Sequence, residues 1–248
     1  MAADRLRARI LTGELGDGDA LPSQDRLLQE FGVSKPTIRE ALRILETEGL
    51  VSVRRGATGG AIVHRPKTGN TAYSIGLVLE SRSITVDDVG QALRRLEADC
   101  AALCAQRPDR ADVLVPSLRE CNEQARRQID DPLPYTHTMA VFHERMIGGC
   151  GNATLSTVAG AVESLWLAHV RTWAERVNDM GRFPSRQYRL DGVAAHDTLT
   201  DLIEAGDVAG AATMAMGHFE PEQFYVEEND PHRLVVAAPL RHLPSPPT

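Results

Sequence analysis

Residues 21–53 read LPSQDRLLQEFGVSKPTIREALRILETEGLVSV, and they contain the strongest signals for the fold of the N-terminal part of the chain. Ser23 is suited to cap a short helix, because its side chain can accept a hydrogen bond from the first turn, and Gly32 ends that helix. Ser34 opens a second helix with Pro36 in its first turn, where a missing N–H costs little. The apolar residues of this second helix recur at the spacing of one buried face: Ile38, Ala41, Leu42 and Leu45.

The flanking segments complete this domain. An amphipathic helix is predicted over roughly residues 4–15, and Gly49 closes the helix that Ser34 opens. Two short β-type runs, LVSV and AIV, flank the sequence RRGATGG, which predicts a two-stranded wing with a glycine-rich tip. Together the segments predict a helix-turn-helix followed by a wing.

The second helix also carries a basic stripe. Lys35, Arg39 and Arg43 are spaced four residues apart, which places them roughly 100° around the helix from its buried face. A recognition helix has this arrangement, with one face packed on its neighbour and an adjacent face turned to phosphates and base edges. An ordinary solvated basic face is the alternative. The tight turn, the proline start and the glycine-rich hairpin around the stripe favour DNA binding.

The charge of the chain is divided between its two parts. Residues 1–67 contain 11 Lys and Arg against 9 Asp and Glu, a net charge of +2, whereas the whole chain of 248 residues has a net charge of −7. This balance excludes a protein that coats nucleic acid indiscriminately, and it favours DNA binding confined to one end. We find no apolar run long enough for a transmembrane helix and no signal peptide, so we expect a cytoplasmic protein.

The rest of the chain predicts a bundle of helices. From about 85 to 229 the hydrophobic pattern is helical and is interrupted at short intervals, which divides the region into about six helices. The fold class is therefore mainly α, with a winged helix-turn-helix domain over 1–65, a linker over 66–84, a helical domain over 85–229 and a tail over 230–248. Four residues, Cys100, Cys104, Cys121 and Cys150, lack a zinc-site spacing and are expected to be buried, reduced thiols.

Candidate chemistry in the helical domain comes from three histidines on different predicted helices, His143, His196 and His218. Three imidazoles that converged would suit Zn²⁺ or Ni²⁺. The residues alone do not show convergence, and a surface or satisfied core histidine is the more common situation. His169, Trp166 and Trp173 share one helix and could line a pocket, although core packing is the simpler account. Asn152 is expected to cap a helix.

The combination LPS…GVSKPTIREAL…EGLV…GG, which spans nearly all of residues 4–65, resembles the winged helix of the GntR family of transcription regulators. The resemblance implies DNA-facing residues in the second helix, the start of the recognition helix, its REAL motif and the wing tip. Geometry adds Arg43 to this set. The DNA-binding candidates are Arg26, Ser34, Lys35, Thr37, Arg39, Arg43 and the wing residues Arg55 through Gly60. Lys35 stands where arginine is more common, so a bidentate contact becomes a point charge.

The segments LRRLEADCAALCA, VFHERMIGGCGNATL and AAHDTLTDLIEAGDVAGAATMAMGHF resemble the FCD effector domain of FadR-type GntR regulators. That resemblance implies a divalent metal site in which His143, His196 and His218 match the family's histidines. Met139 occupies the position of the usual aspartate, and a thioether is a poor ligand for such an ion. Either the three histidines hold Zn²⁺ more weakly, or they contact an anionic effector directly. An effector-binding arginine would align with Leu93, which makes the neighbouring Arg94 a weak candidate.

Together the two resemblances imply a homodimeric regulator, more often a repressor in this family, that reads a palindromic operator in double-stranded DNA. A small carboxylate effector would bind the helical domain and bias the placement of the winged helices. One alternative is a constitutive dimeric DNA-binding protein without an effector. A metal-dependent hydrolase is a third, but no HExxH or similar general-base motif is present.

Overall fold

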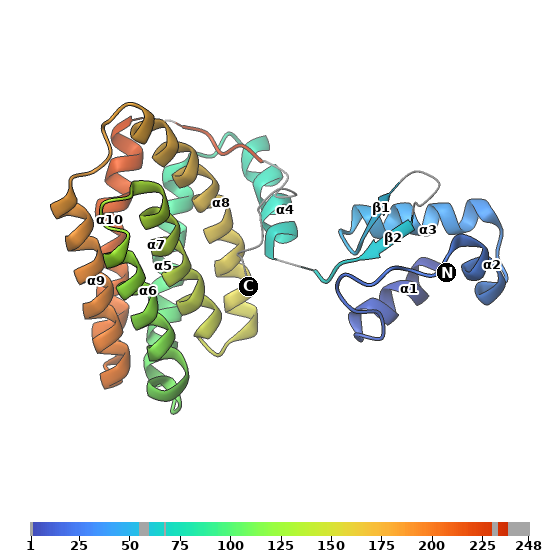
Figure 1. The fold of residues 1–248 in the computed structure, drawn as a ribbon, viewed down its shortest axis with the longest axis horizontal. Helices are drawn as coiled ribbons and strands as arrows, with labels where there is room; N and C mark the ends of the chain where they lie inside the picture. Colours follow the sequence, from blue (N-terminus) through green and yellow to red (C-terminus); the bar gives the residue numbers. More distant parts are fainter. Residues whose placement is uncertain (1, 55–59, 67, 230–232, 238–248) are drawn as a thin grey trace. The chain divides into compact units, whose positions relative to one another are not determined.

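The computed structural model describes residues 2–54, 60–66, 68–229 and 233–237, and the chain divides into two units at residue 70. The N-terminal unit contains three helices and a two-stranded sheet (Figure 1). Its elements are α1 (Ala2–Leu11), α2 (Gln24–Phe31), α3 (Lys35–Thr47), β1 (Val51–Arg54) and β2 (Gly60–Val63). The strands are antiparallel, and their register pairs Val51 with Val63 and Arg54 with Gly60. This is the predicted winged helix-turn-helix, although α1 lies at 2–11 instead of 4–15.

Local signals in the sequence account for α2 and α3. The Ser23 hydroxyl accepts a hydrogen bond from the Arg26 backbone N–H at 3.3 Å, and Gly32 ends α2 with a φ of +63°. Ser34 precedes α3 in an extended conformation, but its hydroxyl pairs with that of Thr37 instead of capping the backbone. The predicted apolar face of α3 is buried against α1, α2 and β1. The core of the unit therefore forms as the hydrophobic spacing predicts.

The C-terminal unit is a helical bundle (Figure 1). Its α-helices are α4 (Thr68–Ser81), α5 (Val86–Gln106), α6 (Val115–Arg127), α7 (Pro132–Gly149), α8 (Ala153–Asp179), α9 (Arg186–Ala205) and α10 (Val208–Asn229), with a π-helical turn at Arg110–Leu114 before α6. α5 packs against α7, α8, α9 and α10, so it is the central helix of the bundle. Six α-helices lie between residues 86 and 229, as predicted, and Asn152 caps α8 by accepting a hydrogen bond from the Leu155 N–H.

Two segments outside 85–229 also belong to the bundle. Most of the range that we expected to be a linker, 66–84, is helix α4, in which Ala72 is fully buried and Ile75 and Leu79 pack beside it in the core around Trp166. The helix was not predicted because the segment begins with polar residues, and its helical apolar spacing starts only further along the chain. In the tail, the Val235 N–H donates to the Ile84 carbonyl and the Val86 N–H donates to the Arg233 carbonyl. Residues 238–248, the end of the predicted tail, lie outside the described part of the chain.

All four cysteines are buried, which confirms their assignment to core packing. Burial raises the pKa of the Cys104 thiol to about 12 and also raises that of Cys100, so both remain protonated and unreactive. Among the described helices, none is long and apolar enough to cross a membrane.

Candidate functional site

The three candidate histidines converge in the C-terminal unit from three different helices. His143 on α7, His196 on α9 and His218 on α10 are all buried. The Nε2 atom of His196 lies 3.2 Å from that of His143 and 3.2 Å from that of His218, and the third side of this triangle measures 3.3 Å. Three ring nitrogens therefore face one point.

Ring packing and hydrogen bonds hold the histidines in these orientations. Phe142 stacks on His196 with ring centroids 3.8 Å apart, and the rings of His143 and His218 are parallel to within 7°. The Nδ1 atom of His143 lies 3.1 Å from Oε2 of the buried Glu97. A carboxylate at Nδ1 favours the tautomer that leaves the Nε2 lone pair free, which is the arrangement common behind metal-bound histidines.

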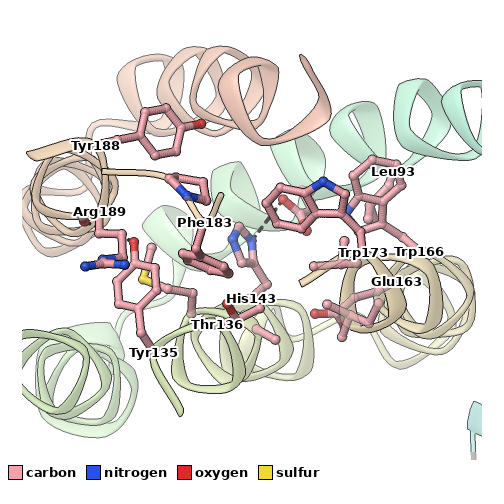
Figure 2. A pocket seen from close by; sticks show the side chains of 16 residues that line it. Leu93, Tyr135, Thr136, His143, Glu163, Trp166, Trp173, Phe183, Tyr188 and Arg189 are labelled. Atoms are coloured by element: carbon pink, nitrogen blue, oxygen red, sulfur yellow. Dashed lines mark hydrogen bonds and ion pairs between the residues drawn. The ribbon is translucent and has the colours of Figure 1, made fainter. Parts of the chain in front are cut away.

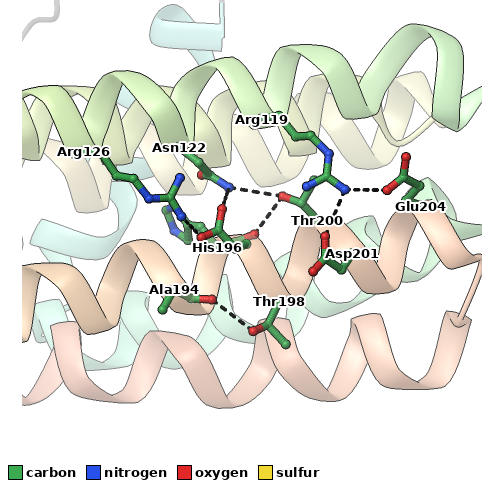
Figure 3. Close-up of polar contacts among 10 residues, drawn as sticks. Arg119, Asn122, Arg126, Ala194, His196, Thr198, Thr200, Asp201 and Glu204 are labelled. Atoms are coloured by element: carbon green, nitrogen blue, oxygen red, sulfur yellow. Dashed lines mark hydrogen bonds and ion pairs between the residues drawn. The ribbon is translucent and has the colours of Figure 1, made fainter.

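The backbone beneath His196 is held by a polar network between α6 and α9 (Figure 3). Asn122 donates to Asp197 at 2.9 Å, and Arg126 pairs with the other oxygen of the same carboxylate. The Thr200 hydroxyl donates to the His196 carbonyl at 2.7 Å. One turn further along α9, Arg119 pairs with carboxylates of that helix. These contacts fix how α9 lies against α6, and they thereby fix the position of His196 along the bundle relative to the other two histidines.

The electrostatics of the cluster favour neutral imidazoles. Burial lowers the pKa of His218 to about 3 and that of His196 well below its usual range, and the neighbouring histidines add to both effects. Neutral imidazole is the form that binds a metal ion. His196 Nδ1 is buried and has no hydrogen-bond partner among the described residues. His196 and His218 are therefore neutral imidazoles at neutral pH, each with one unprotonated ring nitrogen that can bind a metal ion.

The triangle of Nε2 atoms fits a divalent metal ion. For the observed separations of 3.2–3.3 Å, an ion about 2.05 Å from each nitrogen would make N–metal–N angles of roughly 105°, close to tetrahedral. Met139 adds no charge to this set. Its side chain is buried and packs in a small apolar cluster with Tyr135 and Val193. The residues present thus fit three-histidine coordination without a protein carboxylate.

A cavity of about 70 Å³ adjoins the cluster and is lined by His143 (Figure 2). This volume is several times the roughly 10–15 Å³ that one buried water requires, so the cavity is large enough for a small ligand. Trp166 and Trp173 line it as suggested, whereas His169 is not among the lining residues. Leu93 also lines it, but Arg94 does not, so the structure gives the effector assignment of Arg94 no support.

Three buried residues with ionisable side chains line the cavity and were not among the candidates predicted from the sequence. Glu97 is 1% exposed, Glu163 is 4% exposed and Arg189 is 9% exposed. A signal for each was available, because each interrupts an apolar helical face. Glu97 follows Leu93 by four residues, Glu163 precedes Trp166 by three, and Arg189 precedes the buried Val193 by four. A charge at such a position needs a partner or a function.

The cavity wall contains two buried carboxyl groups, and one of them has a strongly raised pKa. Burial, together with the nearby charge of Glu97, raises the pKa of Glu163 to about 8, so Glu163 holds a proton at neutral pH. One oxygen of each group, Oε1, is buried and has no hydrogen-bond partner in the described part of the chain. Arg189 lies over the Phe183 ring at 5.6 Å, and its Nε is also without a partner there.

The DNA-binding candidates are on the surface of the N-terminal unit, apart from the wing residues 55–59, which lie outside the described part of the chain. The candidates on α2 and α3, together with Gly60, are exposed: Arg26, Ser34, Lys35, Thr37, Arg39 and Arg43. Lys35 lies 3.8 Å from Asp25 in an exposed ion pair, which stabilises little. Arg55 falls in the wing segment 55–59, which is not described. The exposed basic side chains of α3 lie on a face adjacent to the one that carries Ile38 and Leu45 into the core.

Comparison with known proteins covers both units. A family model described as bacterial regulatory proteins of the gntR family matches residues 1–59, and one described as the FCD domain matches residues 88–221. The HTH-type transcriptional regulator Mce2R of Mycobacterium tuberculosis is 27% identical over 222 residues, which are 88% of this chain and 86% of that protein. The Exu regulon transcriptional regulator of Escherichia coli is 31% identical over 67% of this chain and 60% of its own length. The solved structure of Streptococcus agalactiae GntR has the same fold, with a TM-score of 0.68 at 21% identity over 90% of this chain and 97% of that one.

Proposed function

Because the chain belongs to the GntR family of bacterial regulatory proteins and carries an FCD domain, it is a transcription regulator, and we propose that a small organic-acid effector controls its affinity for operator DNA. The observation that most supports an effector is the cavity of the C-terminal unit beside the histidine cluster. A ligand that prefers one conformation of the regulator shifts its operator affinity by the ratio of its affinities for the two conformations. The protein would act in the cytoplasm as a homodimer, most simply as a repressor.

For DNA contact we propose the exposed basic face of α3 together with Arg26 and the wing. Arg39 and Arg43 would reach phosphates or guanine edges in the major groove, with Lys35 acting as a point charge. Ser34, Thr37, Arg55 and Gly60 would contact the backbone of the duplex at the ends of this surface. A dimer would present two such faces to a palindrome.

The operator assignment is tested with Arg39→Ala in a gel shift on the chain's own upstream DNA. We expect specific binding to be lost. Arg127→Ala, which removes an exposed arginine from α6 of the other unit, is the charge-matched control and should bind like the parent. Equal operator affinity of Arg39→Ala and the parent would remove α3 from the interface.

We propose that His143, His196 and His218 hold a divalent ion of the Zn²⁺ or Ni²⁺ type. Three imidazoles would leave at least one coordination position for an effector oxygen, and the bound ion would supply a Lewis-acid centre there. Glu97 would orient His143 through its Nδ1, and Arg189 would supply a second positive group for an anionic effector. Without the carboxylate that Met139 replaces, we expect weaker binding than a four-ligand site would give.

Metal content after dialysis against a weak chelator tests this site. We expect close to one equivalent of Zn²⁺ per chain in the parent and in His137→Ala, which removes an exposed histidine of α7. His196→Ala should lose most of it. Less than a tenth of an equivalent in the parent would contradict the metal proposal. A constitutive regulator without an effector would instead show operator affinity and melting temperature that no carboxylic acid changes, with or without metal.

A further inference from the structure

The cavity carries opposite charges at its two ends. Figure 2 shows Glu163 on the same side as Trp166 and Trp173, Arg189 on the opposite side, and His143 between them. Glu97 joins the acidic end, since it contacts His143 and its charge raises the pKa of Glu163. The acidic end thus has two buried carboxyl groups and two indole rings around one space.

This acidic end lacks hydrogen-bond donors that its chemistry requires. Oε1 of Glu97 and Oε1 of Glu163 are both buried without a partner among the described residues. A buried acceptor without a donor destabilises the folded state by roughly 1–3 kcal/mol, and more if it is charged. Leu93, which lines the cavity near this end, supplies neither a donor nor a positive charge. The missing donors are therefore expected from a ligand.

Ligand groups differ in how well they can donate hydrogen bonds to these two Oε1 atoms. A carboxylate has no proton to donate to the two Oε1 atoms and would be repelled by the charge of Glu97, and a hydroxyl has a single proton to donate. A protonated amine has three donors, so it can satisfy both Oε1 atoms at once, and its charge is attracted by the carboxyl groups and by the faces of indole rings. A cation beside Glu163 would also lower the pKa of about 8 that this group has in the ligand-free cavity.

On the premise that the cavity is the effector site, we propose that its ligand is an amino acid or a similar small zwitterion. The protonated amine would contact Glu97 and Glu163 beside Trp166 and Trp173. The anionic end would point toward His143 and Arg189. The effector would then be discriminated from hydroxy acids of the same skeleton by the acidic end of the cavity.

Matched pairs of ligands test this inference. Calorimetric titration of the full chain with one equivalent of Zn²⁺ would compare L-aspartate with L-malate, L-alanine with L-lactate, and 4-aminobutyrate with 4-hydroxybutyrate. We expect at least one amino compound to bind at least tenfold more tightly than its hydroxy partner. Glu163→Gln, which keeps the shape of the side chain, should abolish that preference, whereas Glu175→Gln, an exposed position on the same helix, should retain it.

The outcomes separate this inference from the function on which it rests. If a hydroxy acid binds as tightly as its amino partner or more tightly, the zwitterion is wrong and the effector site stands. If the amino preference is intact in a folded Glu163→Gln variant, the acidic end does not recognise the amine. If no member of any pair binds, both the effector site and this inference are overturned.

Discussion

Glu163 gives a prediction about stability whose size follows from its surroundings. The pKa of this buried carboxyl rises from an ordinary 4.5 to about 8 in the folded protein, mainly because burial disfavours the charged form. Above pH 4.5 the unfolded chain releases this proton while the folded chain keeps it. Folding therefore takes up a proton, and the free energy of unfolding falls as pH rises from about 4.5 to about 8.

The magnitude comes from the same values. One proton corresponds to about 1.4 kcal/mol per pH unit, so the folded state loses roughly 3 kcal/mol by pH 7 and about 5 kcal/mol above pH 8. Glu163→Gln has no proton to exchange. Its advantage in unfolding free energy over the parent should be small at pH 5, should grow by about 1.4 kcal/mol per pH unit, and should level off above pH 8.

Urea unfolding followed by tryptophan fluorescence reports on the C-terminal unit, which contains Glu163. The two tryptophans of the chain are Trp166 and Trp173, and both are buried in α8. Glu175→Gln, exposed on the same helix, should track the parent at every pH. A difference between Glu163→Gln and the parent that does not change between pH 5 and pH 8 would refute the assignment of the proton to Glu163. If the difference grows as expected, the Glu163 carboxyl group beside the ligand lowers the free energy of unfolding of the parent protein at neutral pH.

Three further predictions concern the histidine cluster and the bundle. Met139→Asp places a carboxylate one turn before His143 on α7 and should tighten Zn²⁺ binding at least tenfold in a chelator competition; unchanged affinity would mean that this position does not face the ion. Glu97→Gln should weaken Zn²⁺ about 10–100-fold in the same competition, because the charged partner of His143 Nδ1 is lost, and full retention of affinity would show that Glu97 does not act through His143. Gly206→Ala should lower the unfolding free energy of the bundle by about 1–2 kcal/mol in the fluorescence assay, because Gly206 ends α9 at a φ of +74°; a neutral effect would argue against that conformation.

The N-terminal unit could be predicted from the sequence because its signals are local. The Ser23 cap, the left-handed Gly32 and the spacing from Ile38 to Leu45 each act within a turn or two of the chain. The same holds for the count of helices in the bundle and for the cap at Asn152. Helix α4 was missed because the polar residues at its start match a linker, and its apolar side is recognisable only once Trp166 is beside it.

The site depended on contacts between distant segments. Residue types and resemblance pointed to His143, His196 and His218, but these histidines are 22 to 75 positions apart, and their convergence is decided by how α7, α9 and α10 pack. Glu97, Glu163 and Arg189 each look like one charge on an apolar helix face, and only the packed bundle places them around one cavity. Local sequence sets each helix and its buried face. The rotation and axial position of one helix against another are set by side chains from several helices together. These long-range contacts, which the sequence does not reveal, bring the residues of the site together.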